Sequence, residues 1–446
     1  MPSPRELRFP SGFLWGTATS AHQTEGGNTN NQWWAWEQES GHVWREERSG
    51  RACDWWQRAE EDMARAARMG HNSHRLSIEW SRIEPRQDEF DIAALQRYRR
   101  LLGRMRELGI EPMVTLHHFT NPLWFEKQGA WLSPQAPALL ARFGARAAAA
   151  LGDLVTLWCT INEPTIVATE AYLYGIWPPM QRSLAAARRV VRNMVAAHAA
   201  AYRALKEVRP EAQVGQVAHL RLFEPAWPSS PLDRAVAALL DWVFNRTTLL
   251  AQVDGRLRFP LSLGGHIAGT GCDFVGINYY TRDRVAFDLR YPGELFGRRF
   301  YTPGAEMCDP GWHGNFGEVY PAGLYRCLMD YARLGKPLYV TENGWADAAD
   351  TRRPRALLTH ICAMWRAMQA GAPVRGYYHW TLVDNFEWAE GWGARFGLIA
   401  LDTETQERRP RLSAEVYESI ARANGITPNI VRRFAPEAET AIFGEA

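Results

Sequence analysis

Eight short apolar runs recur along the chain, and most of them are separated by stretches with helical character. Both 54–69 and 93–108 repeat their apolar residues at a period of 3.6, which predicts amphipathic helices. Apolar runs that alternate with helices are typical of parallel strands buried on both faces. The runs are 13–18, 74–78, 112–117, 154–161, 212–218, 274–278, 337–341 and 374–380.

The number of these runs favours a closed barrel. Eight parallel strands with crossover helices form a (β/α)8 TIM barrel, an α/β fold whose active site lies at the carboxyl ends of the strands. An open doubly wound sheet is the alternative, but no glycine-rich phosphate loop follows the first run. We expect one catalytic domain over residues 1–446, with a loose tail from about residue 436.

Composition narrows the possible partners. The formal net charge is +2, from 51 basic and 49 acidic residues, so electrostatics give no reason to expect nucleic-acid binding. No apolar run reaches the roughly 18 residues of a membrane span, and the N-terminus shows no apolar signal segment. The six cysteines have no C-x-x-C spacing, so we expect buried free thiols and a cytoplasmic location. Nothing in the sequence indicates an oligomeric state.

Polar and aromatic residues follow the apolar runs at their carboxyl ends. These ends would open on one face of a barrel. Contact with solvent would explain Asn and Tyr there, but not the density of Glu, His and Trp. The chain has 20 Trp, and flat indole rings can stack on sugar rings. The clusters are 23–26, 79–80, 117–118, 162–163, 278–280, 342–343 and 380–388.

Two of these clusters each contain a glutamate beside an asparagine. Glu163, in T-I-N-E-P, and Glu342, in V-T-E-N-G, follow the fourth and seventh runs and could face each other across the barrel. Two carboxylates on either side of an acetal are the minimum set for glycoside hydrolysis. We expect the retaining spacing of about 5–5.5 Å between them, at which each charge raises the pKa of the other carboxyl.

Neighbouring residues suggest which carboxylate has which role. Arg75, in the second run, and Tyr280, after the sixth, could both support an ionised Glu342, which favours Glu342 as the nucleophile. Asn162 could bind the sugar 2-hydroxyl. His117 and His118 are adjacent, but no further ligand is spaced for a metal, so we expect no metal, with His118 as a sugar ligand and His117 packed in its strand.

Six segments together resemble glycoside hydrolase family 1, the β-glucosidase and β-galactosidase family, over about residues 8–435. Each segment is moderately specific, and all six in this order are very specific. They are F-P-S-G-F-L-W-G-T-A-T-S-A-H-Q-T-E-G, H-R-L-S-I-E-W-S-R-I-E-P, T-I-N-E-P, V-G-I-N-Y-Y-T, V-T-E-N-G and W-T-L-V-D-N-F-E-W-A-E-G-W-G-A-R-F-G-L.

The resemblance implies a TIM barrel that hydrolyses glycosides through a covalent glycosyl-enzyme, without a cofactor. It places the acid/base on Glu163 and the nucleophile on Glu342, with Arg75 and Tyr280 supporting the nucleophile. It also implies a sugar platform at Trp380 and an indole donor at Trp388. The residues expected to bind substrate are Gln23, His118, Phe119, Asn162, Asn278, Tyr280, Trp380, Glu387, Trp388 and Phe396.

The chain departs from the family pattern at several positions. Phe119 stands where the family often has Trp, so one sugar hydroxyl loses an N–H donor unless a neighbour replaces it. Thr24 stands where Ile or Val is usual. Trp345 directly follows E-N-G, and Trp177 lies in Y-G-I-W-P-P; we expect both to line the aglycone side of the site.

The expected substrate is a small glycoside of the glucose or cellobiose type. We predict a retaining, exo-acting β-glucosidase with side activity on β-galactosides and β-fucosides, which acts on cello-oligosaccharides or small aglycones. A transglycosylating β-glycosidase and an inactive sugar-binding barrel remain alternatives. A 6-phospho-glycosidase is disfavoured because Glu387 would repel the phosphate. The sequence leaves the preferred sugar open.

Overall fold

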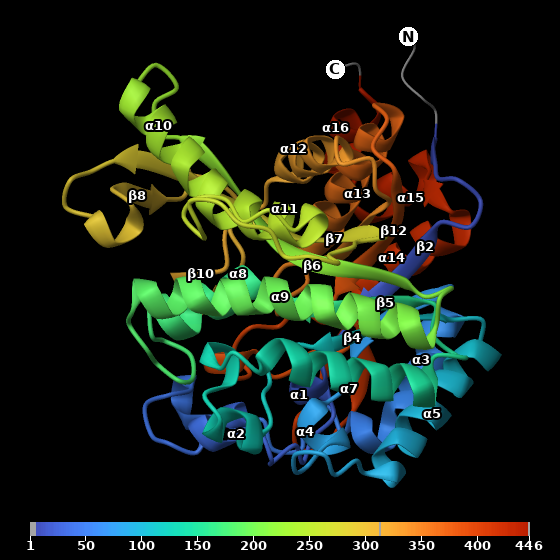
Figure 1. The fold of residues 1–446 in the computed structure, drawn as a ribbon. Helices are drawn as coiled ribbons and strands as arrows, with labels where there is room; N and C mark the ends of the chain where they lie inside the picture. Colours follow the sequence, from blue (N-terminus) through green and yellow to red (C-terminus); the bar gives the residue numbers. More distant parts are fainter. Residues whose placement is uncertain (1–5, 312–313, 445–446) are drawn as a thin grey trace.

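A closed barrel of parallel strands forms the centre of the structure, a computed structural model that describes residues 6–311 and 314–444 (Figure 1). Within these residues, eight strands pair in the order β11-β12-β2-β3-β4-β5-β6-β7, and β11 pairs with β7 to close the ring. The TIM barrel and all eight predicted strands are confirmed. The strands are β2 Leu14–Ala18, β3 Ser73–Ser77, β4 Glu111–His117, β5 Leu157–Asn162, β6 Gln213–Pro225, β7 Phe274–Phe287, β11 Leu338–Asn343 and β12 Val374–Trp380.

Helices surround the barrel and bury one stripe each against it. The amphipathic stretches predicted at 54–69 and 93–108 form α3 and α5, with ends within one residue of the prediction. Helix α9 packs along α7, as Figure 1 shows across the front of the barrel. No helix in the described ranges has the length and apolar character needed to cross a bilayer. The outer helices are α3 Trp55–Arg68, α5 Ile92–Glu107, α7 Ala136–Leu151, α9 Leu184–Val208, α11 Thr247–Asp254, α12 Pro321–Ala332, α13 Arg353–Gln369 and α14 Leu412–Ala423.

Shorter elements make up the connections. Several follow barrel strands directly, so they carry the residues that come after the strand ends. The short helices are α1 Ala21–Thr24, α2 Gln32–Glu37, η1 Trp44–Glu46, α4 Trp80–Ile83, α6 Leu123–Lys127, η2 Ala130–Leu132, α8 Pro164–Ile166, η3 Val167–Leu173, η5 Pro292–Glu294 and η6 Trp388–Glu390. The short strand pairs are β1 Leu7–Arg8 with β15 Gly425–Ile426, β9 Pro310–Gly311 with β10 Gly314–Asn315, and β13 Ile399–Leu401 with β14 Arg408–Pro410.

Strands β6 and β7 continue beyond the barrel into a projecting arm, which the sequence did not predict. In the barrel, residues 214–218 of β6 and 274–279 of β7 are all buried, whereas the outer parts of both strands mix buried and partly exposed residues. This change marks where the strands leave the two-sided core. The arm adds antiparallel β8 Gly297–Phe300, α10 Pro231–Leu240 and η4 Asp241–Arg246, and Figure 1 shows α10 and β8 projecting from the barrel.

The predicted loose tail is wrong for residues 436–443. This segment follows α15 Pro428–Phe434 and forms η7 Pro436–Ala438 and α16 Glu439–Phe443, which lies against α13. Ala438 and Ile442 are both buried. The pattern A-x-x-x-I places two apolar side chains four residues apart on one helix face, and this spacing holds the segment on the barrel.

Candidate active site

Glu163 and Glu342 line one cavity at the carboxyl ends of the barrel strands. The cavity has a volume of about 290 Å³. Glu342 lies near the end of β11, and Glu163 comes directly after β5. Glu163 has a left-handed backbone with φ of 47°, and Pro164 then begins α8. Such a conformation is costly for a residue with a Cβ, and it turns the chain sharply at the point where the carboxylate enters the cavity.

Two donors hold the carboxylate of Glu342. Arg75 Nη1 donates to Oε1 at 2.5 Å, and the Tyr280 hydroxyl donates to Oε2 at 2.7 Å. Burial, together with the charge of Glu163, raises the pKa of Glu342 to about 7, although Arg75 and Tyr280 lower it. We expected these two donors to keep Glu342 ionised. Because burial outweighs them, Glu342 holds its proton more tightly than an ordinary glutamate does.

Glu163 has a different set of partners. Asn278 Nδ2 donates to its Oε1 at 2.6 Å, and His219 Nδ1 lies 3.2 Å from the same oxygen. Thr341 fixes Asn278 by donating to its Oδ1 at 2.7 Å. The imidazole of His219 also stacks on the ring of Tyr280. The two carboxylates thus have distinct environments within one cavity: an arginine and a phenol for Glu342, an amide and an imidazole for Glu163.

Arg75, Asn162 and Asn278 lie behind the cavity wall, where almost none of their surface is exposed. Arg75 Nη2 donates to Asn162 Oδ1 at 2.6 Å, and Asn162 Nδ2 lies 3.2 Å from His118 Nε2. The Asn162 amide nitrogen carries two N–H donors, and His118 can accept only one of them, so the predicted contact between Asn162 and a sugar hydroxyl stays a prediction. These three residues position the groups that do line the cavity.

One end of the cavity has the composition of a sugar site. Gln23 Nε2 donates to Glu387 Oε2 at 3.1 Å, and both residues line the cavity with His118, Trp380 and Trp388. The rings of His118 and Trp380 lie nearly parallel, 6.0 Å apart. Burial, together with the charge of Glu342, raises the pKa of Glu387 to about 8. This end offers hydrogen-bonding groups beside flat aromatic surfaces.

His118 is neutral and keeps one ring nitrogen unused. Burial and the charge of Arg75 lower the pKa of His118 well below its usual range. If Asn162 donates to Nε2, the ring proton is on Nδ1, which has no hydrogen-bond partner among the described residues. His117 packs against Trp131 and bonds to Asn121, so its predicted structural role is confirmed.

Aromatic side chains line the rest of the cavity. Phe119, with φ of 70°, packs against Trp177 and Trp388 at ring distances of 5.1 and 5.3 Å. Phe396 and Trp177 also line the cavity, as predicted. The prediction for Trp345 is wrong. Its ring is 2% exposed and packs against His360, on α13, and His379, so it belongs to the core behind the site.

Several cavity residues were not predicted. His219 directly follows the run 212–218, and the rule that polar residues follow apolar runs would have identified it, had it been applied to the fifth run. Glu170 lies on η3, and Arg221 lies on the part of β6 beyond the predicted strand, so neither position carried a signal. The other unpredicted lining residues are Ile166, Ile176, Gly314, Phe316, Ala389 and Glu390.

Comparison with known proteins identifies the family to which this chain belongs. The family model for glycosyl hydrolase family 1 matches residues 5–262 and 263–426. The chain belongs to this family. Among curated family 1 relatives, it is 32% identical to β-glucosidase A of Thermotoga maritima, over 94% of the chain and 99% of that protein. It is 31% identical to a β-galactosidase of Pyrococcus woesei, over 95% of the chain and 98% of that protein.

Solved structures agree with this assignment. The β-glycosidase from Pyrococcus horikoshii superposes with a TM-score of 0.88 at 38% sequence identity, covering 96% of this chain and 98% of that one. This family 1 protein is therefore a glycoside hydrolase of the β-glycosidase type. Within the described residues, no group of three or more His, Cys, Asp or Glu side chains is arranged to hold a metal ion.

Proposed function

We propose that this family 1 enzyme is a retaining, exo-acting β-glucosidase that also accepts β-galactosides and β-fucosides. The observation that carries the proposal is the asymmetric pair of carboxylates in one cavity. The guanidinium of Arg75 and the hydroxyl of Tyr280 both hold the carboxylate of Glu342, so the ionised carboxylate is oriented to act as the nucleophile. Glu163 is held by an amide and an imidazole, and it can carry the proton that a leaving group needs.

The reaction then runs in two steps. In the first, Glu342 attacks the anomeric carbon while Glu163 gives its proton to the glycosidic oxygen, so the aglycone leaves as an alcohol and the sugar is bound to Glu342. In the second, Glu163 takes a proton from water, the water oxygen attacks the anomeric carbon, and Glu342 is released. The atoms balance without a cofactor.

The size and lining of the cavity support exo action on small substrates. A cavity of about 290 Å³ suits one or two sugar rings rather than a long chain. Gln23 and Glu387 can bond equatorial and axial 4-hydroxyls alike, which supports activity on both glucosides and galactosides. The curated relatives carry both names. We propose cello-oligosaccharides and small aryl or alkyl glucosides as substrates.

Transglycosylation is the second candidate, because an aromatic aglycone wall favours alcohols over water. Of the two tryptophans expected on this side, Trp177 lines the cavity but Trp345 does not. We therefore place hydrolysis first. A cytoplasmic location is also proposed, on the ground that all six cysteines are free and buried.

Chemical rescue tests the roles of the two glutamates. Glu342→Ala should abolish turnover of an activated nitrophenyl β-glucoside, and added azide should restore release of nitrophenol with an α-glucosyl azide as product. Glu163→Ala with azide should instead give the β-glucosyl azide, because the covalent intermediate still forms on Glu342. NMR of the anomeric proton distinguishes the two products. The reverse pattern would exchange the two roles, and rescue of neither variant would refute the proposal.

A further inference from the structure

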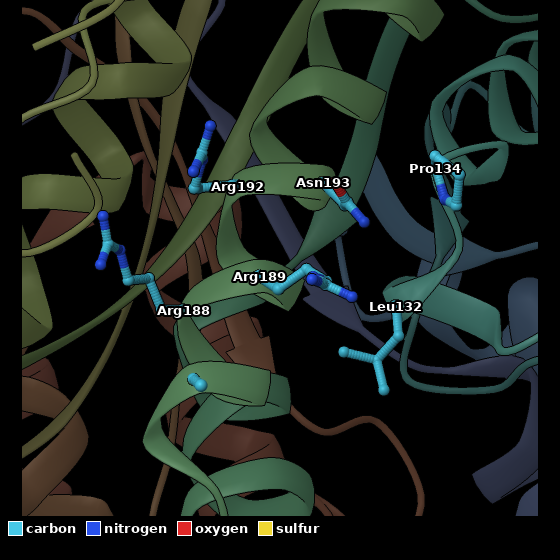
Figure 2. A pocket seen from close by; sticks show the side chains of 7 residues that line it. Leu132, Pro134, Arg188, Arg189, Arg192 and Asn193 are labelled. Atoms are coloured by element: carbon cyan, nitrogen blue, oxygen red, sulfur yellow. The ribbon is translucent and has the colours of Figure 1, made fainter.

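A groove lined by arginines lies apart from the active-site cavity. It has a volume of about 590 Å³ and lies between helix α9 and the loop that follows η2. Figure 2 shows Arg189 and Asn193 directed toward that loop, with Arg188 and Arg192 on the other side of the α9 ribbon. Small-molecule sites typically have volumes of roughly 300–1,000 Å³, so the groove is large enough for a ligand. Its lining residues are Leu132, Pro134, Ala185, Arg188, Arg189, Arg192 and Asn193.

The groove has a concentrated positive charge. Arg192 is four residues from Arg188 and three from Arg189, so the three side chains leave α9 within little more than one turn and add their positive charges around the groove. No acidic residue occurs between Glu170 and Glu207, so this part of α9 provides no carboxylate to offset them.

The facing segment provides no carboxylate either, because the sequence has no acidic residue between Glu126 and Asp153. Within residues 6–311 and 314–444, neither Arg189 nor Arg192 has an ion pair or a side-chain hydrogen bond. Arg142, on the neighbouring helix α7, is different, because it pairs with Glu84 and Asp88. The arginines of the groove are thus left without the counter-charge that Arg142 has.

The walls of the groove are fixed in place. Asn193 Nδ2 donates to the carbonyls of Trp131, at 2.8 Å, and Ser133, at 3.2 Å, which ties the loop to α9. Arg188 Nε donates to the Leu261 carbonyl at 2.9 Å, which holds that side chain while its two terminal nitrogens make no hydrogen bond within the described residues. A ligand would therefore find the loop, the helix and Arg188 already in place, and binding would have to order the side chains of Arg189 and Arg192.

We propose that this groove binds a small oxyanion with two or more negative charges, and that a phosphorylated compound is the best match. Guanidinium groups bind phosphate oxygens through paired, charge-assisted hydrogen bonds. Leu132, Pro134 and Ala185 give the groove an apolar wall for an uncharged part of the same ligand. The active-site cavity is lined by several glutamates, among them Glu163, Glu170 and Glu342, so it disfavours the same anion.

Calorimetric titration of the full chain with sodium pyrophosphate at low ionic strength tests the proposal. We expect one site, and Arg189→Ala/Arg192→Ala should weaken the affinity about tenfold or more. The matched control is Arg68→Ala/Arg100→Ala, which removes the same charge from exposed arginines on α3 and α5. The control should change the affinity less than about twofold, since only the general field is altered.

A second variant separates binding from folding. Ala185→Glu places a carboxylate in the groove near the start of α9, where an acidic residue favours the helix, so it should abolish binding without lowering the melting temperature. Comparing the affinities of phenyl phosphate and inorganic phosphate then shows whether the groove binds a phosphate ester or free phosphate. Tighter binding of the ester would indicate that the apolar wall contributes, and equal binding would indicate the free anion.

Three results would overturn the proposal. They are the absence of binding to the unaltered chain at millimolar pyrophosphate, equal weakening by the groove and control variants, and competitive inhibition of glucoside hydrolysis with the same concentration dependence as binding. The last result would place the anion in the active-site cavity.

Discussion

Arg75 Nη1 lies 2.5 Å from the carboxylate of Glu342, and within the described residues Arg75 is the only one that hydrogen-bonds both that carboxylate and Asn162, the neighbour of Glu163. Its guanidinium therefore links the ends of the fourth and seventh barrel strands, although Arg75 itself lies in the middle of the second, β3. Arg75 is fully buried, and its charge is balanced by Glu342. Removing this cation would leave a buried carboxylate unpaired, so it supports the fold as well as the chemistry.

Replacing Tyr280 by Phe should move the acidic limb of the pH–rate profile to higher pH. The Tyr280 hydroxyl lowers the pKa of Glu342, which stands at about 7, so its loss raises that pKa. Less of the proposed nucleophile is then ionised at neutral pH. We expect kcat/KM to fall most below pH 7, with the acidic limb displaced by roughly 0.5–1 pH unit. The pH–rate profiles of both proteins with a nitrophenyl β-glucoside measure the shift. If the acidic limb does not move, ionisation of Glu342 is not what this limb reports.

Glu163→Ala should affect poor leaving groups far more than good ones. A dinitrophenolate departs without a proton, whereas an alkoxide needs one from the proposed acid. We expect kcat/KM for an alkyl glucoside to fall about 100-fold more than that for dinitrophenyl glucoside. Both substrates are assayed with one enzyme preparation, which controls for misfolding. An equal decrease in kcat/KM for both substrates would show that Glu163 is not the general acid.

Glu387→Gln should stabilise the protein in mildly alkaline solution. The pKa of Glu387 is raised from 4.5 to about 8, so the unfolded chain loses this proton before the folded one, and stability falls as the pH rises from 4.5 toward 8. An amide cannot ionise, so the variant should gain on the order of 4 kcal/mol near pH 8 and little near pH 4.

The exposed Glu437→Gln is the control for that measurement and should show no such pH dependence. Thermal melts between pH 4 and pH 9 measure both variants. A constant difference between Glu387→Gln and the unaltered protein across this range would contradict the prediction. The same variant should show a higher KM, because the carboxyl group that we expect to bind sugar hydroxyls is replaced by an amide.

Trp177→Phe and Trp345→Phe form a matched pair that separates the cavity from the core. Trp177 lines the cavity, so its replacement should change the ratio of kcat/KM between aryl and alkyl glucosides. Trp345 is packed against His360, so its replacement should lower the free energy of unfolding by about 1–3 kcal/mol and leave that ratio unchanged. A change of aglycone preference in the Trp345 variant would show that Trp345 does line the aglycone side, as its position after E-N-G led us to expect.

Local patterns were sufficient to predict the barrel and the facing pair of glutamates, whereas most of the other predicted site residues came from the resemblance to family 1. The eight apolar runs are buried on both faces, and such strands need crossover helices, so the period of hydrophobicity already implies the architecture. The carboxyl ends of parallel strands open on one face, which brings Glu163 and Glu342 together across 179 residues of chain, counted as 342 − 163. The helix limits followed from the 3.6-residue period in the same way.

Only the tertiary structure decided which side chains reach the cavity and in what state. Trp345 and Trp177 look alike in sequence, but the direction of each side chain depends on how the loops pack, and Trp345 turns into the core. The pKa of Glu342 reflects a balance between burial and three neighbours from separate strands, which adjacent residues do not reveal. The barrel could be predicted because the periodicity of apolar residues is visible among neighbours in the sequence. The burial and charge environment of a side chain depend on residues that meet only after folding.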